Sequence, residues 1–135
     1  LERIEELIEL LPEIMNIYPN NLDFKSLYFR ALAEESQWTV ILEQASLLKK
    51  EQQAEIIYPL TLAKYRMGFI DQAYQDCMKP TNNHFYEYWS LIAEIAELVE
   101  DFELAKYCYK GMIAIYPNNN SMDSWNKLHN LRHQA

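Results

Sequence analysis

Apolar residues recur at steps of three and four along most of this chain, the spacing that places side chains on one face of a helix. The clearest example runs from Tyr86 to Asn119, where two such patterns are separated by a short turn at Glu100-Asp101. The first stripe consists of Trp89, Ile92, Ala93, Ala96 and Val99, and the second of Ala105, Cys108, Met112 and Ile115. Because the turn is short, we expect two antiparallel helices that bury these stripes against each other and against adjoining helices.

The remainder of the chain shows the same helical pattern, interrupted by short breaks. Its predicted elements are a half repeat at 1–21, helix pairs at 22–50, 54–80 and 86–119, and a capping helix at 121–133. Pro12 predicts a kink or a break inside the first helix, whereas Pro59 indicates either a kinked helix or one that begins near this residue. No stretch alternates apolar and polar residues long enough to predict a strand. We therefore predict an all-α fold that forms one domain over 1–135.

The pair at 86–119 resembles a tetratricopeptide repeat. The matching positions are the early aromatic residue Trp89, the small residues Ala93 and Ala105, the second aromatic residue Tyr109 and the terminal Pro117. Ala96 and Met112 depart from the family pattern, which usually has tyrosine and alanine there. Trp38, Phe69 and Phe102 follow one another at steps of 31 and 33 residues, about one repeat. The resemblance implies a right-handed α-solenoid of antiparallel helix pairs, covered at its end by the capping helix.

The pair at 22–50 departs further from the family pattern. Phe29 stands where a small residue is usual, and Ile41 where alanine is usual. Because larger side chains hold helix axes apart, we expect a looser crossing in this pair than in the pair at 86–119.

The resemblance also implies a binding surface, because in tetratricopeptide arrays the exposed face of the first helices lines a concave groove. The positions that this rule selects are Arg30, Tyr58, Leu62, Tyr65, Arg66, Glu87, Glu94 and Glu97. Tyr58, Leu62 and Tyr65 are candidate apolar anchors for a peptide, and the glutamates form an acidic wall that favours a basic or polar one. The alternatives are packing of the tyrosines against a neighbouring helix and an acidic face that only contacts solvent.

The net charge of the chain limits the classes of partner that it is expected to bind. The formal net charge of −8 opposes binding to nucleic acid and to anionic lipid. No apolar window reaches the ~20 residues that span a bilayer, and no secretory leader is recognisable. Cys77 and Cys108 are read as small buried residues rather than a disulfide or a redox pair, which favours the cytoplasm.

The sequence offers little for catalysis or cofactor binding. His129 and His133 are four residues apart but lack a third ligand for a metal, and two glycines cannot build a phosphate-binding loop. A general acid–base pair at Glu94 and Glu97 would need a pocket that raises one pKa, and nothing in the sequence indicates such a pocket. We expect no enzyme activity, no cofactor and no metal.

Two functional hypotheses remain. The first is a non-catalytic protein–protein interaction module, an adaptor or chaperone that binds a peptide or a partner helix in the groove. The second is the sensor or oligomerisation domain of a larger bacterial transcription regulator, with homodimer formation as one consequence. The half repeat and the start at Leu1 instead of methionine favour a piece of a larger protein.

Overall fold

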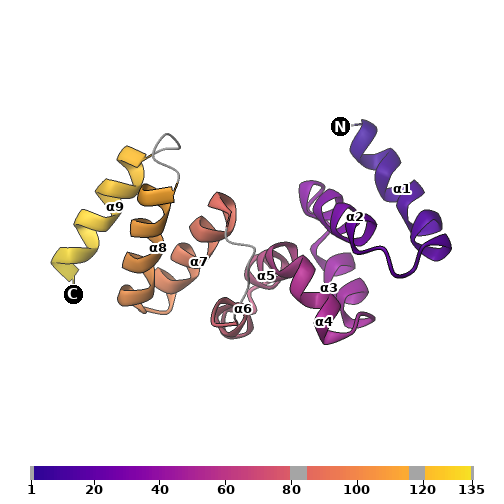
Figure 1. The fold of residues 1–135 in the computed structure, drawn as a ribbon. Helices are drawn as coiled ribbons and strands as arrows, with labels where there is room; N and C mark the ends of the chain where they lie inside the picture. Colours follow the sequence, from indigo (N-terminus) through magenta and orange to yellow (C-terminus); the bar gives the residue numbers. More distant parts are fainter. Residues whose placement is uncertain (1, 80–84, 116–120, 135) are drawn as a thin grey trace. The chain divides into compact units, whose positions relative to one another are not determined.

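The computed structural model describes residues 2–79, 85–115 and 121–134, with the side chains of 2, 121–124 and 132–134 left undescribed. Within these ranges the chain contains helices and turns but no strand (Figure 1). It divides into two compact units, Leu1–Phe69 and Ile70–Ala135. Unit 1 contains α1 (Glu2–Ile17), α2 (Leu22–Glu34), α3 (Trp38–Ser46), α4 (Lys50–Gln53), a 3₁₀ turn η1 (Ala54–Ile56) and α5 (Ile57–Arg66). Unit 2 contains α6 (Ile70–Cys77), α7 (Tyr86–Leu98), α8 (Phe102–Ile115) and α9 (Ser121–Gln134). The all-α prediction is confirmed.

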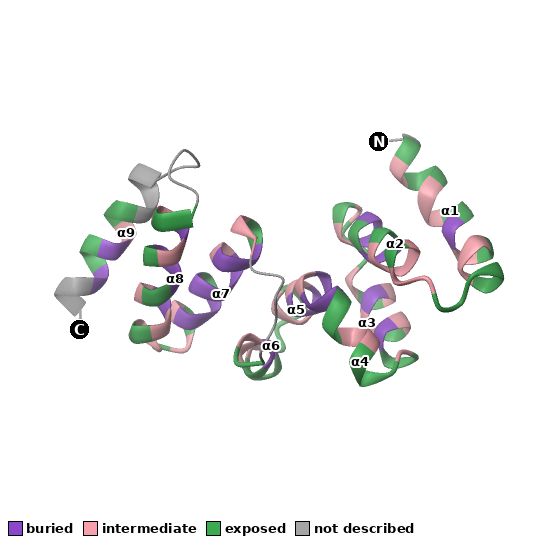
Figure 2. Ribbon diagram, viewed as in Figure 1, coloured by how far each residue is buried: buried purple, intermediate pink, exposed green. Residues whose placement is uncertain are grey.

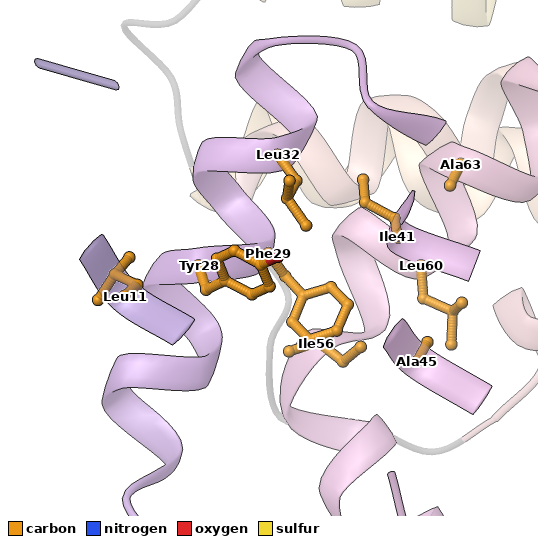
Figure 3. Close-up of a cluster of buried hydrophobic side chains, with 9 residues drawn as sticks. All are labelled: Leu11, Tyr28, Phe29, Leu32, Ile41, Ala45, Ile56, Leu60 and Ala63. Carbon is orange, nitrogen blue, oxygen red and sulfur yellow. The ribbon is translucent and has the colours of Figure 1, made fainter. Parts of the chain in front are cut away.

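The core of unit 1 is one cluster of apolar side chains contributed by every helix of the unit except α4 (Figure 3). Its members are Leu11, Tyr28, Phe29, Leu32, Ile41, Ala45, Ile56, Leu60 and Ala63. The ring of Phe29 is only 1 % exposed. This large aromatic side chain is therefore enclosed in a core that α1, α2, α3, η1 and α5 share.

Unit 2 is organised around α7, which packs against α6 and, more extensively, against α8; α8 in turn packs against α9. Seven of the thirteen α7 residues are buried, which makes it the most enclosed helix of the unit (Figure 2). Its crossing with α8 is close: a Cβ atom on Gly111 would lie 3.1 Å from the indole of Trp89. The α7–α8 contact is more extensive than that of α2 with the shorter helix α3, and the looser crossing expected for the earlier pair stays a prediction.

Three helices end in the same hydrogen-bonded turn. Ser36, Gly68 and Glu100 have φ angles of 55°, 86° and 65°, in the left-handed region. After each of them, the next N–H donates to the carbonyl five residues earlier, at 2.9, 2.8 and 2.8 Å. This pair of features defines the Schellman motif, which satisfies carbonyls that a helix end leaves unpaired.

The turns recur at a fixed interval of 32 residues, at 36, 68 and 100. The helices that follow begin at the same interval, at Trp38, Ile70 and Phe102. Burial repeats as well, since Ile41, Ala73 and Ala105 are all 0 % exposed. The structure thus has a 32-residue period in turns, helix starts and core positions, within the range that the aromatic residues predicted.

The two prolines differ in their effect on the helices. Helix α1 continues through Pro12, so the predicted break is absent. Helix α5 begins at Ile57, which places Pro59 in the first turn, where a missing N–H breaks no helical bond. Helix α3 ends at Ser46, earlier than the predicted pair boundary, and the amide of Gln53 donates to the carbonyls of Ala45 and Leu48 at 3.0 and 3.3 Å.

Glu100→Gly is expected to raise the free energy of unfolding by about 0.5–1 kcal/mol. A non-glycine residue in the left-handed region has a steric penalty, which glycine removes. Glycine also loses more backbone entropy on folding, and this offsets part of the gain. Gly68→Ala is the opposite control, expected to destabilise by about 1 kcal/mol. Because no atom lies within 4 Å of the added Cβ, that loss is conformational. Urea unfolding of both variants checks the signs, and stabilisation by Gly68→Ala would contradict the turn assignment.

Candidate partner-binding surface

The predicted binding residues of unit 1 lie on α2 and α5. Tyr58, Leu62 and Tyr65 are partly buried and share one face of α5, because they are four and three residues apart. The buried residues of α5 are Ile57, Pro59, Leu60, Thr61 and Ala63. Arg66 ends the helix and is exposed, as is Arg30 on α2. The structure therefore leaves part of each anchor side chain accessible on a helix that also contributes to the core.

The face of α5 that carries Tyr58, Leu62 and Tyr65 also makes contacts within the protein itself. The guanidinium carbon of Arg66 lies 5.8 Å from the centre of the Tyr65 ring, which is cation–π range. Tyr58 and Tyr65 make further interactions inside the protein. These contacts reduce the side-chain freedom that would be lost on binding, so the rings are partly ordered in advance.

The predicted binding residues of unit 2 form a stripe along α7. Glu87 and Glu94 are exposed, and Glu97 is partly buried. The residues of α7 that the neighbouring helices cover are Tyr88, Trp89, Leu91, Ile92, Ala93, Ile95 and Ala96. Glu87 and Glu94 therefore lie on a part of α7 that its neighbours leave open, whereas Glu97 is partly covered.

Acidic residues at the C-terminal end of this stripe have structural roles. Glu97 accepts a hydrogen bond from the hydroxyl of Tyr109 on α8, at 2.9 Å. Asp101 accepts from the backbone N–H of Leu104, at 3.2 Å, and so caps the start of α8. It also accepts from the hydroxyl of Tyr74 on α6, at 2.6 Å, and this bond raises the pKa of Tyr74 above its ordinary value. Glu87 and Glu94 are therefore the carboxylates best placed to meet a partner.

The eight predicted residues fall in both units. Arg30, Tyr58, Leu62, Tyr65 and Arg66 belong to unit 1, and Glu87, Glu94 and Glu97 to unit 2. Tyr58, Leu62 and Tyr65 share one face of α5, and the three glutamates lie on α7. A single groove that joins the two sets stays a prediction.

The sequence patterns did not reveal a hollow in unit 1 formed by α1, α2 and the start of α3. Three glutamates, Glu5, Glu9 and Glu35, stand around it. The one sequence signal was the four-residue step from Glu5 to Glu9 beside the apolar Ile8. The contribution of Glu35 depends on tertiary packing, so helical periodicity did not predict it.

Chemically reactive groups are few among the described residues. Burial raises the pKa of the Cys77 and Cys108 thiols to about 12, so both stay protonated near neutral pH and are weak nucleophiles. In the described part of the chain, no three His, Cys, Asp or Glu side chains are grouped to hold a metal. His129 is exposed on α9, while His84 and the side chain of His133 lie outside the described residues. Over the same residues, no helix has the length and apolar character to cross a bilayer.

Comparison of the chain with protein-family models, curated proteins and solved structures found no match.

Proposed function

We propose that the chain is a non-catalytic protein–protein interaction module, an adaptor or chaperone whose tetratricopeptide-like array binds a peptide or a partner helix. The observation that carries this proposal is the 32-residue period of Schellman turns, helix starts and fully buried positions. Arrays of repeated helix pairs present extended surfaces, and these surfaces commonly bind other proteins. The low nucleophilicity of both thiols is consistent with a role in binding.

The proposed contacts follow from exposure and charge. Tyr58, Leu62 and Tyr65 offer partly buried apolar side chains, the kind that anchors a peptide when the remaining exposed area becomes covered. Arg66 and the exposed pair Glu87 and Glu94 set the orientation of charged groups on the ligand. Glu97 contributes less, because its carboxylate already accepts a hydrogen bond from Tyr109.

The experiment starts from a peptide enriched by the full chain from a random library, with affinity measured by fluorescence anisotropy. Tyr65→Ala is expected to weaken binding about tenfold or more, the effect of losing an aromatic anchor. Glu94→Lys is expected to weaken binding of a basic peptide and to reduce its salt dependence, because it reverses a charge at the surface.

Glu103→Lys is the matched control for the charge reversal. Glu103 is exposed on α8, outside the proposed surface, and forms an ion pair with Lys106 at 3.5 Å. Its replacement should leave the affinity unchanged. Equal affinity in Tyr65→Ala, Glu94→Lys and the parent chain would refute the proposed surface.

A further inference from the structure

The hollow formed by α1, α2 and α3 has a volume of about 280 Å³ and a mixed lining. Apolar side chains come from all three helices, namely Ile8, Leu32 and Val40. Carboxylates come from Glu5, Glu9 and Glu35. The volume lies just below the ~300–1,000 Å³ typical of small-molecule pockets, so it suits one long side chain better than a helix.

The three carboxylates are placed by two different elements. Glu5 and Glu9 are one helical turn apart on α1, where like charges at this spacing repel each other. Glu35 is the residue that caps the C-terminal end of α2, and its backbone N–H donates to the carbonyl of Ala31 at 3.2 Å, immediately before the left-handed residue Ser36. Within the described ranges, none of the three carboxylates forms an ion pair. The hollow therefore concentrates negative charge that the chain itself leaves unbalanced.

Tyr28 provides a second and independent observation. Its side chain is part of the lining, although the residue is only 6 % exposed. Burial raises the pKa of its hydroxyl, which keeps the phenol neutral. This hydroxyl has no hydrogen-bond partner among the residues that the structure describes. Although the residue is largely buried, its hydroxyl oxygen is not among the fully enclosed polar atoms, so it offers a ligand in the hollow an unused hydrogen-bond acceptor as well as charge.

We propose that this hollow binds a single arginine or lysine side chain of a partner protein. The aliphatic stem of that side chain would lie on Ile8, Leu32 and Val40, and its cationic head would lie among Glu5, Glu9 and Glu35. Long basic side chains carry this combination of apolar stem and charged end, and binding one relieves the repulsion between the carboxylates. Anionic ligands are repelled, and a wholly apolar ligand would cover the carboxylates without balancing them.

This site shares no residue with the proposed binding residues of α5 or of α7, so the two proposals can fail separately. Tyr65→Ala should leave binding at the hollow unchanged. Conversely, substitutions in the hollow test only whether a basic side chain is recognised there.

The probe is a capped Gly-Arg-Gly peptide, titrated into the ¹⁵N-labelled full chain and followed by amide chemical shifts. Saturable shifts are expected at residues 32–40 and along α1. The matched peptide with citrulline, which has the same shape without the charge, should bind about tenfold more weakly, as should the Arg peptide to a Glu9→Gln/Glu35→Gln variant. Glu13→Gln, an exposed glutamate of α1 outside the lining, is the control and should change nothing.

Several outcomes would overturn the proposal. Equal affinity for the citrulline peptide and the Arg peptide would show that the hollow does not recognise the positive charge. Chemical-shift changes centred outside α1 and residues 32–40 would place the binding site elsewhere. The same shifts with calcium chloride alone would indicate a metal site. Tighter binding of spermidine than of the Arg peptide would assign the hollow to a polyamine instead of a protein side chain. Circular dichroism of the Gln variant confirms that lost binding is not lost folding.

Discussion

Phe29→Ala is expected to lower the free energy of unfolding by about 3–5 kcal/mol, the range for removing a fully buried aromatic ring. The ring is 1 % exposed and belongs to a cluster that collects side chains from α1, α2, α3 and α5 (Figure 3). Removing it leaves a cavity that rigid neighbours fill only in part. Urea unfolding followed by far-ultraviolet circular dichroism measures the change.

The control for this prediction lies two residues away on the same helix. Leu27 is 43 % exposed, so Leu27→Ala should lower the free energy of unfolding by much less than Phe29→Ala does. Phe29→Leu should fall between the two, because it keeps most of the apolar contact. A loss below about 1 kcal/mol for Phe29→Ala would show that the ring does not fill the core of unit 1.

Ala105→Leu is expected to destabilise unit 2 by about 1–3 kcal/mol or more, through overpacking. Ala105 is 0 % exposed, in the first turns of α8, which packs closely against α7. Alanine and leucine are both good helix formers, so the effect reports packing and not helix propensity.

Ala114→Leu is the matched control, because Ala114 is exposed near the end of the same helix. It should change stability by less than about 0.5 kcal/mol. If Ala105→Leu were as well tolerated as Ala114→Leu, the close approach of α7 and α8 would not depend on a small residue at this position.

Much of the local structure was predictable because helices and their turns depend on nearby residues. The three- and four-residue apolar spacing predicted α7 and α8, and the tight turn at Glu100-Asp101 is present with Asp101 as the cap of α8. The aromatic residues at the turns indicated a repeat of about the observed length. Where side chains contact only the neighbouring helix of their own hairpin, the spacing of apolar residues was enough to predict the structure.

Features that depend on distant residues were not predictable in the same way. The short helix α4 and turn η1 follow an early end of α3, where the Gln53 side chain satisfies carbonyls five and eight residues earlier. Nothing in composition marks the division of the chain after Phe69. The hydrogen bond that engages Glu97 comes from Tyr109 on the next helix. Helical spacing placed Glu97 on the open face of α7 but did not predict this bond.

Photo-crosslinking tests partner binding on the open faces of α5 and α7 most directly. A photoreactive benzoylphenylalanine is placed in turn at the exposed positions Arg66 and Glu94, and at the exposed control positions Glu43 on α3 and Glu103 on α8. With a library-selected peptide, we predict crosslinks from positions 66 and 94 and none from 43 and 103. Crosslinks from the control positions alone, or equal yields from all four, would contradict the proposed surface.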